Sequence, residues 1–215
     1  MDKAELFRKF EQMKVIPVVK IDDANDAPPL ADAFVKGGLP CAEITFRTAA
    51  AADAIKKMAL RGGMLVGAGT VLTVDTVKKA VDCGAVFIVA PGFNPTVVEY
   101  CVKNNIPVTP GVATPTEIEM GLDLGVDVLK FFPAEAMGGL KTLSAISAPY
   151  GKVRFVPTGG IDEKNLAAYL AFAKTLCCGG TWIAKADLIN AKAFDQIADI
   201  TKRAVEIAKT AGQKK

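Results

Sequence analysis

One lysine of this chain lies within an apolar segment, where a side-chain amine could act as a nucleophile. Lys130 is the polar residue of the otherwise apolar run 128–132. Burying an ammonium group without a partner is costly, so a lysine in such a segment tends to lose its proton. A neutral amine near physiological pH is what Schiff-base chemistry requires. The alternative is structural: Lys130 extends to the end of the strand, or it pairs with a carboxylate in the core.

A second segment, residues 41–47, alternates between polar and apolar side chains. Glu43, Thr45 and Arg47 share one face of a strand with this spacing, and the apolar residues between them share the other. If the apolar face packs on helices, Glu43 is a candidate general acid and base, and Arg47 can bind a carboxylate through two parallel hydrogen bonds. The alternative is that Glu43 and Arg47 form structural ion pairs, with each other or with Lys130.

Glycines end three other apolar runs and offer bare backbone amides to a ligand. The segments are 67–70, 157–160 and 179–181. Backbone N–H groups of Gly159 and Gly160, together with a threonine hydroxyl, can hold a phosphate. The alternative is that these glycines only form tight turns between a strand and a helix.

The composition narrows the possible chemistry further. The 215 residues include no histidine, which excludes Ser/His and Cys/His nucleophile pairs, a histidine base, and histidine-ligated zinc or iron. The five cysteines are odd in number and show no CxxC spacing, as is typical of reduced thiols in a cytosolic protein. The sequence holds neither a Walker loop nor a GxGxxG motif after a strand. We therefore expect no metal and no organic cofactor.

Charge and hydropathy argue against two classes of partner. With 26 basic and 23 acidic residues, the formal net charge is +3, too small for the basic surface that binds nucleic acid. No run approaches the roughly 18 consecutive apolar residues that a membrane span needs, and residues 1–13 lack the apolar core of a secretory signal. We expect a globular cytoplasmic protein, with neither nucleic acid nor membrane as a partner.

Apolar runs recur at intervals of about 20 to 27 residues, which suits one strand, one helix and two short loops. The predicted strands are 15–19, 41–46, 65–71, 86–90, 107–112, 128–132, 153–157 and 176–184. The predicted helices between them are 30–36, 49–60, 76–81, 97–102, 117–122, 140–146 and 166–173. Caps and early prolines predict helix starts at Asp75, Asn94-Pro95 and Thr114-Pro115. A further amphipathic helix is predicted within residues 1–13.

Eight strand and helix units predict an α/β fold, a (β/α)8 TIM barrel with an extra N-terminal helix, as a single domain over residues 1–215. A doubly wound open sheet is the runner-up. The barrel is favoured because polar residues stand near the C-terminal ends of successive runs, which converge at one mouth in a barrel. These residues are Lys20, Glu43, Arg47, Thr70, Lys130, Thr158 and Thr181. Barrels often bind phosphate in the loops after strands seven and eight, where the glycines of 159–160 and 179–180 stand.

The chain also resembles the bacterial 2-dehydro-3-deoxy-6-phosphogluconate aldolases, a family that includes 4-hydroxy-2-oxoglutarate aldolases. The similarity runs from about residue 15 to residue 187. The segments that carry it are 16–19 (IPVV), 43–48 (EITFRT), 67–71 (GAGTV), 110–112 (PGV), 130–135 (KFFPAE), 157–161 (PTGGI) and 179–182 (GGTW). Together these motifs are highly specific.

The resemblance implies a class I aldolase on a trimeric (β/α)8 barrel. Such an enzyme cleaves the phosphorylated keto-deoxy acid to pyruvate and glyceraldehyde 3-phosphate in the Entner–Doudoroff pathway. By the resemblance, Lys130 forms the Schiff base, Glu43 shuttles protons and Arg47 binds the pyruvate carboxylate. Thr70 would contact pyruvate as well. No cofactor is needed, because a protonated imine accepts the electrons of the broken bond.

The resemblance also assigns the remainder of the substrate pocket. The further substrate-binding residues are Pro91, Phe132, Thr158, Gly159, Gly160, Thr181 and Lys20. Pro91 and Phe132 would form walls of the pocket, the two glycines and Thr181 would bind the phosphate, and Lys20 would grip the distal part of the substrate. The family often has serine where this chain has Thr181, so the hydroxyl is kept and a methyl group is added.

The same residues fit other functions. An aldolase for the galactonate epimer, or one that splits 4-hydroxy-2-oxoglutarate into pyruvate and glyoxylate, would share Lys130, Glu43 and Arg47. A phosphosugar isomerase on the same barrel would use Glu43 as a base, without covalent chemistry. A binding module without catalytic activity is a further alternative, because a fold alone does not fix a function.

Overall fold

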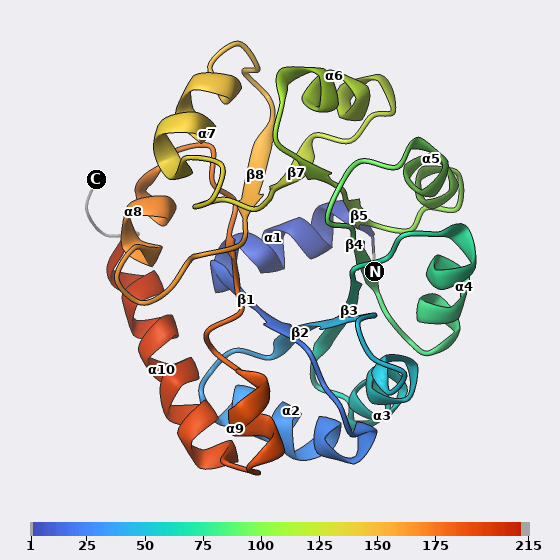
Figure 1. Ribbon diagram of the computed structural model, residues 1–215, viewed down its shortest axis with the longest axis vertical. Helices are drawn as coiled ribbons and strands as arrows, with labels where there is room; N and C mark the ends of the chain where they lie inside the picture. The colour runs from blue at the N-terminus through green and yellow to red at the C-terminus, as the bar shows by residue number, and fades with distance from the viewer. Residues whose placement is uncertain (1, 212–215) are drawn as a thin grey trace.

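The strands form a curled parallel sheet that helices surround in Figure 1, which draws the computed structural model. The structure describes residues 2–211. The strands are β1 (Val15–Val19), β2 (Cys41–Thr45), β3 (Leu65–Gly69), β4 (Phe87–Val89), β5 (Val108–Thr109), β6 (Gly111–Val112), β7 (Val128–Phe131), β8 (Arg154–Pro157) and β9 (Cys178–Gly180). The α/β class predicted from the sequence is therefore confirmed.

The strands pair in two parallel sets. One set has the order β5-β4-β3-β2-β1-β9 and the other β6-β7-β8. Two isolated parallel bridges, Phe155 with Thr175 and Thr158 with Gly179, connect the β8 region to the β9 region. Pro110 divides the predicted strand 107–112 into β5 and β6, because proline has no N–H to donate to a ladder. As a result β5 pairs with β4, while β6 pairs with β7.

Helices follow the strands as the sequence pattern predicts. They are α1 (Lys3–Met13), the 3-10 helix η1 (Ala24–Asp26), α2 (Ala27–Lys36), α3 (Ala51–Arg61), α4 (Val74–Asp82), α5 (Pro95–Lys103), α6 (Pro115–Asp123), α7 (Gly139–Ser147), α8 (Leu166–Ala171), α9 (Ala186–Asn190) and α10 (Phe194–Ala211). The pattern did not single out α9 or α10. Within residues 2–211, none of these helices is both long and apolar enough to cross a membrane.

Two of the three predicted helix starts are confirmed. Asn94 caps α5 by accepting from the Thr96 N–H, and Thr114 forms a capping box with Glu117 at the start of α6. The start predicted at Asp75 is wrong. Thr73 is the extended residue before α4 and its hydroxyl accepts from the Thr76 N–H, so Asp75 lies within the first turn.

The apolar residues form two separate layers. The larger cluster lies between strands and helices and includes the fully buried Phe131 and Phe155. The smaller cluster joins α1 to the inner face of the sheet. Its members include Leu6, Phe7, Phe10, Ile16, Cys41, Phe87 and Val128. Because most of these strand residues stand at the starts of their strands, α1 covers the N-terminal end of the sheet.

Candidate active site

Lys130 and Glu43 meet inside the curled sheet, although they belong to different strand sets. Lys130 is in β7 and Glu43 is in β2, and the Lys130 Nζ lies 3.6 Å from the Glu43 Oε1. Each side chain is only 6% exposed. The structural alternative, a buried lysine paired with a carboxylate, is therefore part of the observed geometry. It does not compete with a catalytic role, since a nucleophile and a proton carrier must lie this close.

The distance between Lys130 and Glu43 leaves the Glu43 Oε1 without a hydrogen bond. A distance of 3.6 Å is longer than a hydrogen bond, and Glu43 Oε1 is buried without a hydrogen-bond partner in the described part of the chain. A buried polar atom without a partner is costly in free energy. Glu43 can therefore accept a proton from a group that enters the space beside Lys130.

Glycines of β3 make room for the side chains of Glu43 and Phe87. Thr45 is in register with Gly69, and Glu43 with Gly67. A Cβ on Gly69 would lie 2.0 Å from the Glu43 Oε1, so any other residue there would collide with the carboxylate. A Cβ on Gly67 would lie 2.1 Å from the ring of Phe87. Both glycines therefore have a packing reason of their own within the strand.

An aromatic ring lies near the amine, and the Pro91 backbone lies close to the neighbouring strand β6. The Lys130 Nζ is 5.1 Å from the centroid of the half-buried Phe132 ring, which favours a cation over the ring face. Lys130 is in register with Gly111 of β6. A Cβ on Gly111 would lie 2.1 Å from the carbonyl oxygen of Pro91, so glycine lets the Pro91 backbone approach this strand closely.

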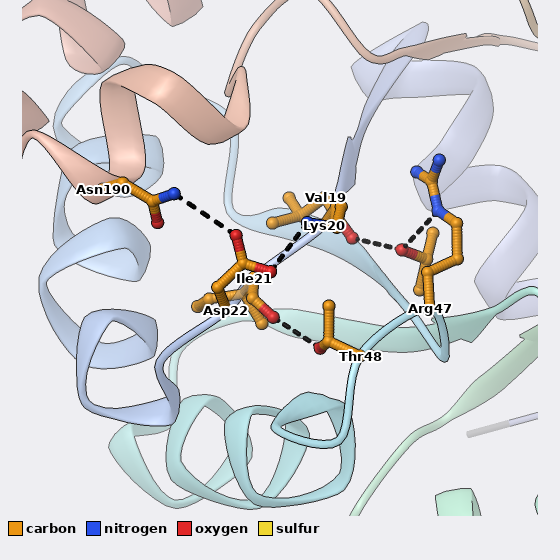
Figure 2. Close-up of polar contacts among 8 residues, drawn as sticks. Val19, Lys20, Ile21, Asp22, Arg47, Thr48 and Asn190 are labelled. Carbon is orange, nitrogen blue, oxygen red and sulfur yellow. Dashed lines mark hydrogen bonds and ion pairs between the residues drawn. The ribbon is translucent and has the colours of Figure 1, made fainter.

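Arg47 is oriented by a hydrogen-bond chain and does not pair with Glu43. Its Nε donates to the Thr45 Oγ1 over 3.1 Å, and that hydroxyl donates to the Val19 carbonyl over 2.8 Å (Figure 2). No carboxylate in the described residues lies within ion-pair distance of Arg47. The structural alternative of a Glu43–Arg47 pair is therefore wrong. The exposed guanidinium keeps its terminal nitrogens for an anion.

Thr70 follows β3 directly and adopts an unusual backbone conformation. Its φ of 56° lies in the left-handed region that residues other than glycine rarely occupy. Strain of this kind costs about 1–3 kcal/mol and is concentrated at functional sites. Thr70 is therefore a strained residue at the strand end where the family resemblance implies a pyruvate contact.

Lys20 is held by partners that the sequence analysis did not identify. Its Nζ donates to the Asp22 Oδ1 over 2.7 Å, and the Asn190 Nδ2 donates to the Asp22 Oδ2 over 3.3 Å (Figure 2). The hydrogen bond from Lys20, and then the one from Asn190, lowers the pKa of Asp22 below its usual value. None of these contacts reaches Lys130. A carboxylate two residues after Lys20 was the only sequence signal, and Asn190 gave none.

The two predicted phosphate loops lie side by side. Thr158 is buried and forms a parallel bridge with Gly179, so the loop after β8 adjoins β9. A Cβ on Gly179 would lie 2.3 Å from the Thr158 Oγ1, which explains the glycine at that position. Gly159 and Gly160 have φ values of 98° and 79°, a conformation that favours glycine. Thr181 follows β9 and is exposed.

A comparison with protein-family models identifies the family of the sequence that forms this site. The model described as KDPG and KHG aldolase matches residues 7–200. This chain belongs to that family. Its similarity to the 2-dehydro-3-deoxy-phosphogluconate aldolase of Treponema pallidum is 47% identity over 203 residues, which cover 94% of this chain and 97% of the relative.

Solved structures of KDPG aldolases share the fold. The Zymomonas mobilis ZM4 enzyme, determined with 3-phosphoglycerate, has a TM-score of 0.88 and 38% identity, covering 95% of this chain and 97% of that one. The Legionella pneumophila enzyme, with pyruvate captured as a covalent carbinolamine, has a TM-score of 0.89 and 37% identity, covering 92% and 97%. The resemblance seen in the motifs is confirmed. The chain is an aldolase, a carbon–carbon lyase, rather than an isomerase or a binding module.

Proposed function

We propose that this chain is a class I aldolase that cleaves 2-dehydro-3-deoxy-6-phosphogluconate to pyruvate and glyceraldehyde 3-phosphate through a Schiff base on Lys130. The observation that carries the proposal is the buried amine of Lys130, 3.6 Å from the Glu43 Oε1, which has no hydrogen-bond partner in the described structure. The names of the relatives support the substrate. The carbinolamine captured in the Legionella enzyme supports covalent chemistry.

The two residues can carry the complete reaction. Glu43 takes a proton from Lys130, and the neutral amine adds to the C2 carbonyl. Glu43 gives that proton to the carbinolamine hydroxyl, which leaves as water, and the product is an iminium ion. Glu43 removes the proton of the C4 hydroxyl as the C3–C4 bond breaks, and the electrons of that bond pass into the iminium. Glyceraldehyde 3-phosphate leaves with its new carbonyl group. Glu43 then returns the proton to C3 of the enamine, and hydrolysis releases pyruvate and Lys130.

The remaining residues position the substrate. Arg47 binds the carboxylate of the substrate through its free guanidinium nitrogens and so orients the scissile bond. Thr70 contacts the pyruvate portion, and Pro91 and Phe132 form walls around it. Thr158, Gly159, Gly160 and Thr181 make up the phosphate end of the pocket, and Lys20 lies at its distal rim.

We further propose one (β/α)8 barrel domain, assembled as a homotrimer in the cytoplasm and acting in the Entner–Doudoroff pathway. The barrel is supported by the bridges between the β8 and β9 regions and by the continuity of β5 and β6 across Pro110, since these are the two places where the strand sets adjoin. The trimer and the pathway rest on the family resemblance, and the cellular location rests on the five cysteines, which show no CxxC spacing.

A kinetic comparison of three substrates tests the proposal. We expect the highest kcat/KM for the phosphorylated gluconate, because remote binding of the phosphate helps to position the reacting carbons. The phosphorylated galactonate epimer and the unphosphorylated 4-hydroxy-2-oxoglutarate should both be slower. A higher kcat/KM for either competitor would contradict the proposed substrate while leaving the Schiff-base chemistry intact.

A further inference from the structure

A buried tyrosine and a glutamate are joined behind the loop that the proposed function assigns to phosphate. The hydroxyl of Tyr169, in α8, donates to the carboxylate of Glu135, in the turn after β7. The Tyr169 side chain is almost wholly buried at 1% exposure. Burial, and then the hydrogen bond to Glu135, raises the pKa of Tyr169, so the phenol keeps its proton and remains a donor. Neither residue takes part in the chemistry described above.

The turn that carries Glu135 holds the glycine loop, residues 158–160, by its backbone. The Ala134 N–H donates to the Thr158 carbonyl over 2.8 Å, and the Glu135 N–H donates to the Gly159 carbonyl over 3.0 Å. In a trans peptide the C=O and the next N–H point in opposite directions. The N–H groups of Gly159 and Gly160 therefore point away from the turn, and neither donates a hydrogen bond within residues 2–211.

The Glu135–Tyr169 pair is closely packed between two glycines, and neither position has room for a side chain. A Cβ on Gly160 would lie 2.5 Å from the Glu135 Cβ. A Cβ on Gly139, at the start of α7, would lie 3.0 Å from the Glu135 Oε1 and 3.2 Å from the Tyr169 hydroxyl. The glutamate is thus fixed by its backbone, by close packing and by the tyrosine. Its position in turn determines where the glycine loop can lie.

We propose that the Glu135–Tyr169 hydrogen bond positions the glycine loop so that the Gly159 and Gly160 N–H groups face the phosphate of the substrate. The inference rests on the proposed function, since it needs a phosphate at that loop. Glu135 and Tyr169 are positioning residues, because they act through the backbone of residues 134 and 135. Tyr169 also donates to the Glu135 carboxylate, which lies next to Gly160, and an unpaired carboxylate there would repel an anion.

The test compares two aldehydes in condensation with pyruvate. Tyr169→Phe, which removes only the hydroxyl, should raise KM for glyceraldehyde 3-phosphate about 10-fold, less than the roughly 100-fold that a 1 Å misplacement can cause. The kcat/KM for unphosphorylated glyceraldehyde should stay within about twofold of wild type, since that substrate does not use the loop. Glu135→Leu should act like Tyr169→Phe. Glu135→Gln keeps an acceptor for the phenol and should retain most of the affinity.

A matched control exists in the second Tyr–Glu pair of this chain. The Tyr150 hydroxyl donates to the Glu119 Oε1 over 2.9 Å, between the α7–β8 connection and α6. Tyr150→Phe removes a bond of the same kind and should leave KM for both aldehydes unchanged. An equal loss for both aldehydes in Tyr169→Phe, or no change in KM for the phosphorylated one, would overturn the positioning role. A wild-type enzyme without preference for the phosphorylated aldehyde would instead overturn the phosphate site itself.

Discussion

The two ends of the curled sheet use the same inner face for different purposes. At the N-terminal end Cys41 packs beneath α1 with Phe10 and Phe87, and burial raises the pKa of the Cys41 thiol so that it stays neutral. Two residues further along β2, the same face carries Glu43, which meets Lys130. One end is an apolar plug and the other a buried charge pair. A position on this face therefore serves stability or chemistry according to its height along the strand.

The largest effect is expected where the polar end is altered. Glu43→Gln removes the proton carrier but keeps the shape of the side chain. Cleavage and the exchange of pyruvate methyl protons in deuterated water should both fall about 10²- to 10⁴-fold, the usual contribution of general acid–base catalysis.

A glutamate at the opposite end provides the control for that change. Glu11, in α1, pairs with Arg154 over 2.9 Å, so Glu11→Gln removes a charge of the same kind without approaching Lys130. Its activity should equal that of the wild type. If proton exchange persisted in Glu43→Gln while cleavage failed, the base acting at C3 would be another residue.

A truncation in the apolar plug should lower stability and leave activity unchanged, the reverse of what is expected for Glu43→Gln. Phe10 is 1% exposed and meets Phe87 edge to face, with ring centroids 5.0 Å apart. Phe10→Ala should lower the free energy of unfolding by about 3–5 kcal/mol, measured by urea denaturation. The kcat/KM of the protein that remains folded should be unchanged. A loss of activity at unchanged stability would show that the two ends are not separate.

A smaller effect is expected at the phosphate loop after β9. Thr181→Ala removes one hydroxyl donor to a charged acceptor, a loss of about 1.5–3 kcal/mol, or roughly 10- to 150-fold in kcat/KM for the phosphorylated aldehyde. Thr181→Ser keeps the hydroxyl and serves as its control, with activity close to wild type. If Thr181→Ala slowed phosphorylated and unphosphorylated aldehydes equally, Thr181 would support the fold and the phosphate would bind elsewhere.

The smallest effect is expected at the rim. The pKa of Asp22 is lowered in the folded state from its usual 3.8, so ionised Asp22 stabilises the fold above that value, and the contribution is lost as pH falls through the lowered pKa. Asp22→Asn should lower Tm slightly at pH 7, and the difference from wild type should shrink below pH 3.8.

The exposed pair of Lys36 and Asp195 is a control that separates the effect of Asp22 on stability from its effect on substrate binding through Lys20. Asp195 also has a lowered pKa, because Lys36 donates a hydrogen bond to it. Asp195→Asn should show the same pH trend in Tm with no change in KM. Asp22→Asn should also raise KM for the phosphorylated substrate by less than about fivefold, because Lys20 loses the ion pair that orients it. An unchanged KM in Asp22→Asn would contradict a role of Lys20 in substrate binding.

The sequence predicted the elements well because burial leaves a simple local pattern. The alternation around Glu43 and the apolar run around Lys130 are both confirmed as strands. The misses have local causes of their own. Pro110 interrupted a ladder within an apolar run, and Thr73 took the cap that Asp75 was expected to provide. To predict either feature, one must know which backbone groups lack a hydrogen-bond partner. The periodicity of the sequence does not show this.

The site could be predicted only as a set of residue types at strand ends. That Lys130 and Glu43 lie 3.6 Å apart follows from the curl of the sheet, which no spacing in the sequence encodes. The Asp22–Asn190 contact and the Glu135–Tyr169 contact likewise join segments that are distant along the chain. Asn190 and Tyr169 lie in none of the motifs that the sequence shows, so only the folded chain identifies them as partners.

The most direct test of the account is to trap the imine at Lys130. Incubation with pyruvate and borohydride should reduce it to a stable secondary amine, and peptide mapping should find the added three-carbon unit on Lys130. This lysine is expected because its side chain is only 6% exposed and lies beside Glu43. Label on Lys130 that requires pyruvate would be the predicted result. Label on another lysine, or no label at all, would contradict the Schiff-base mechanism.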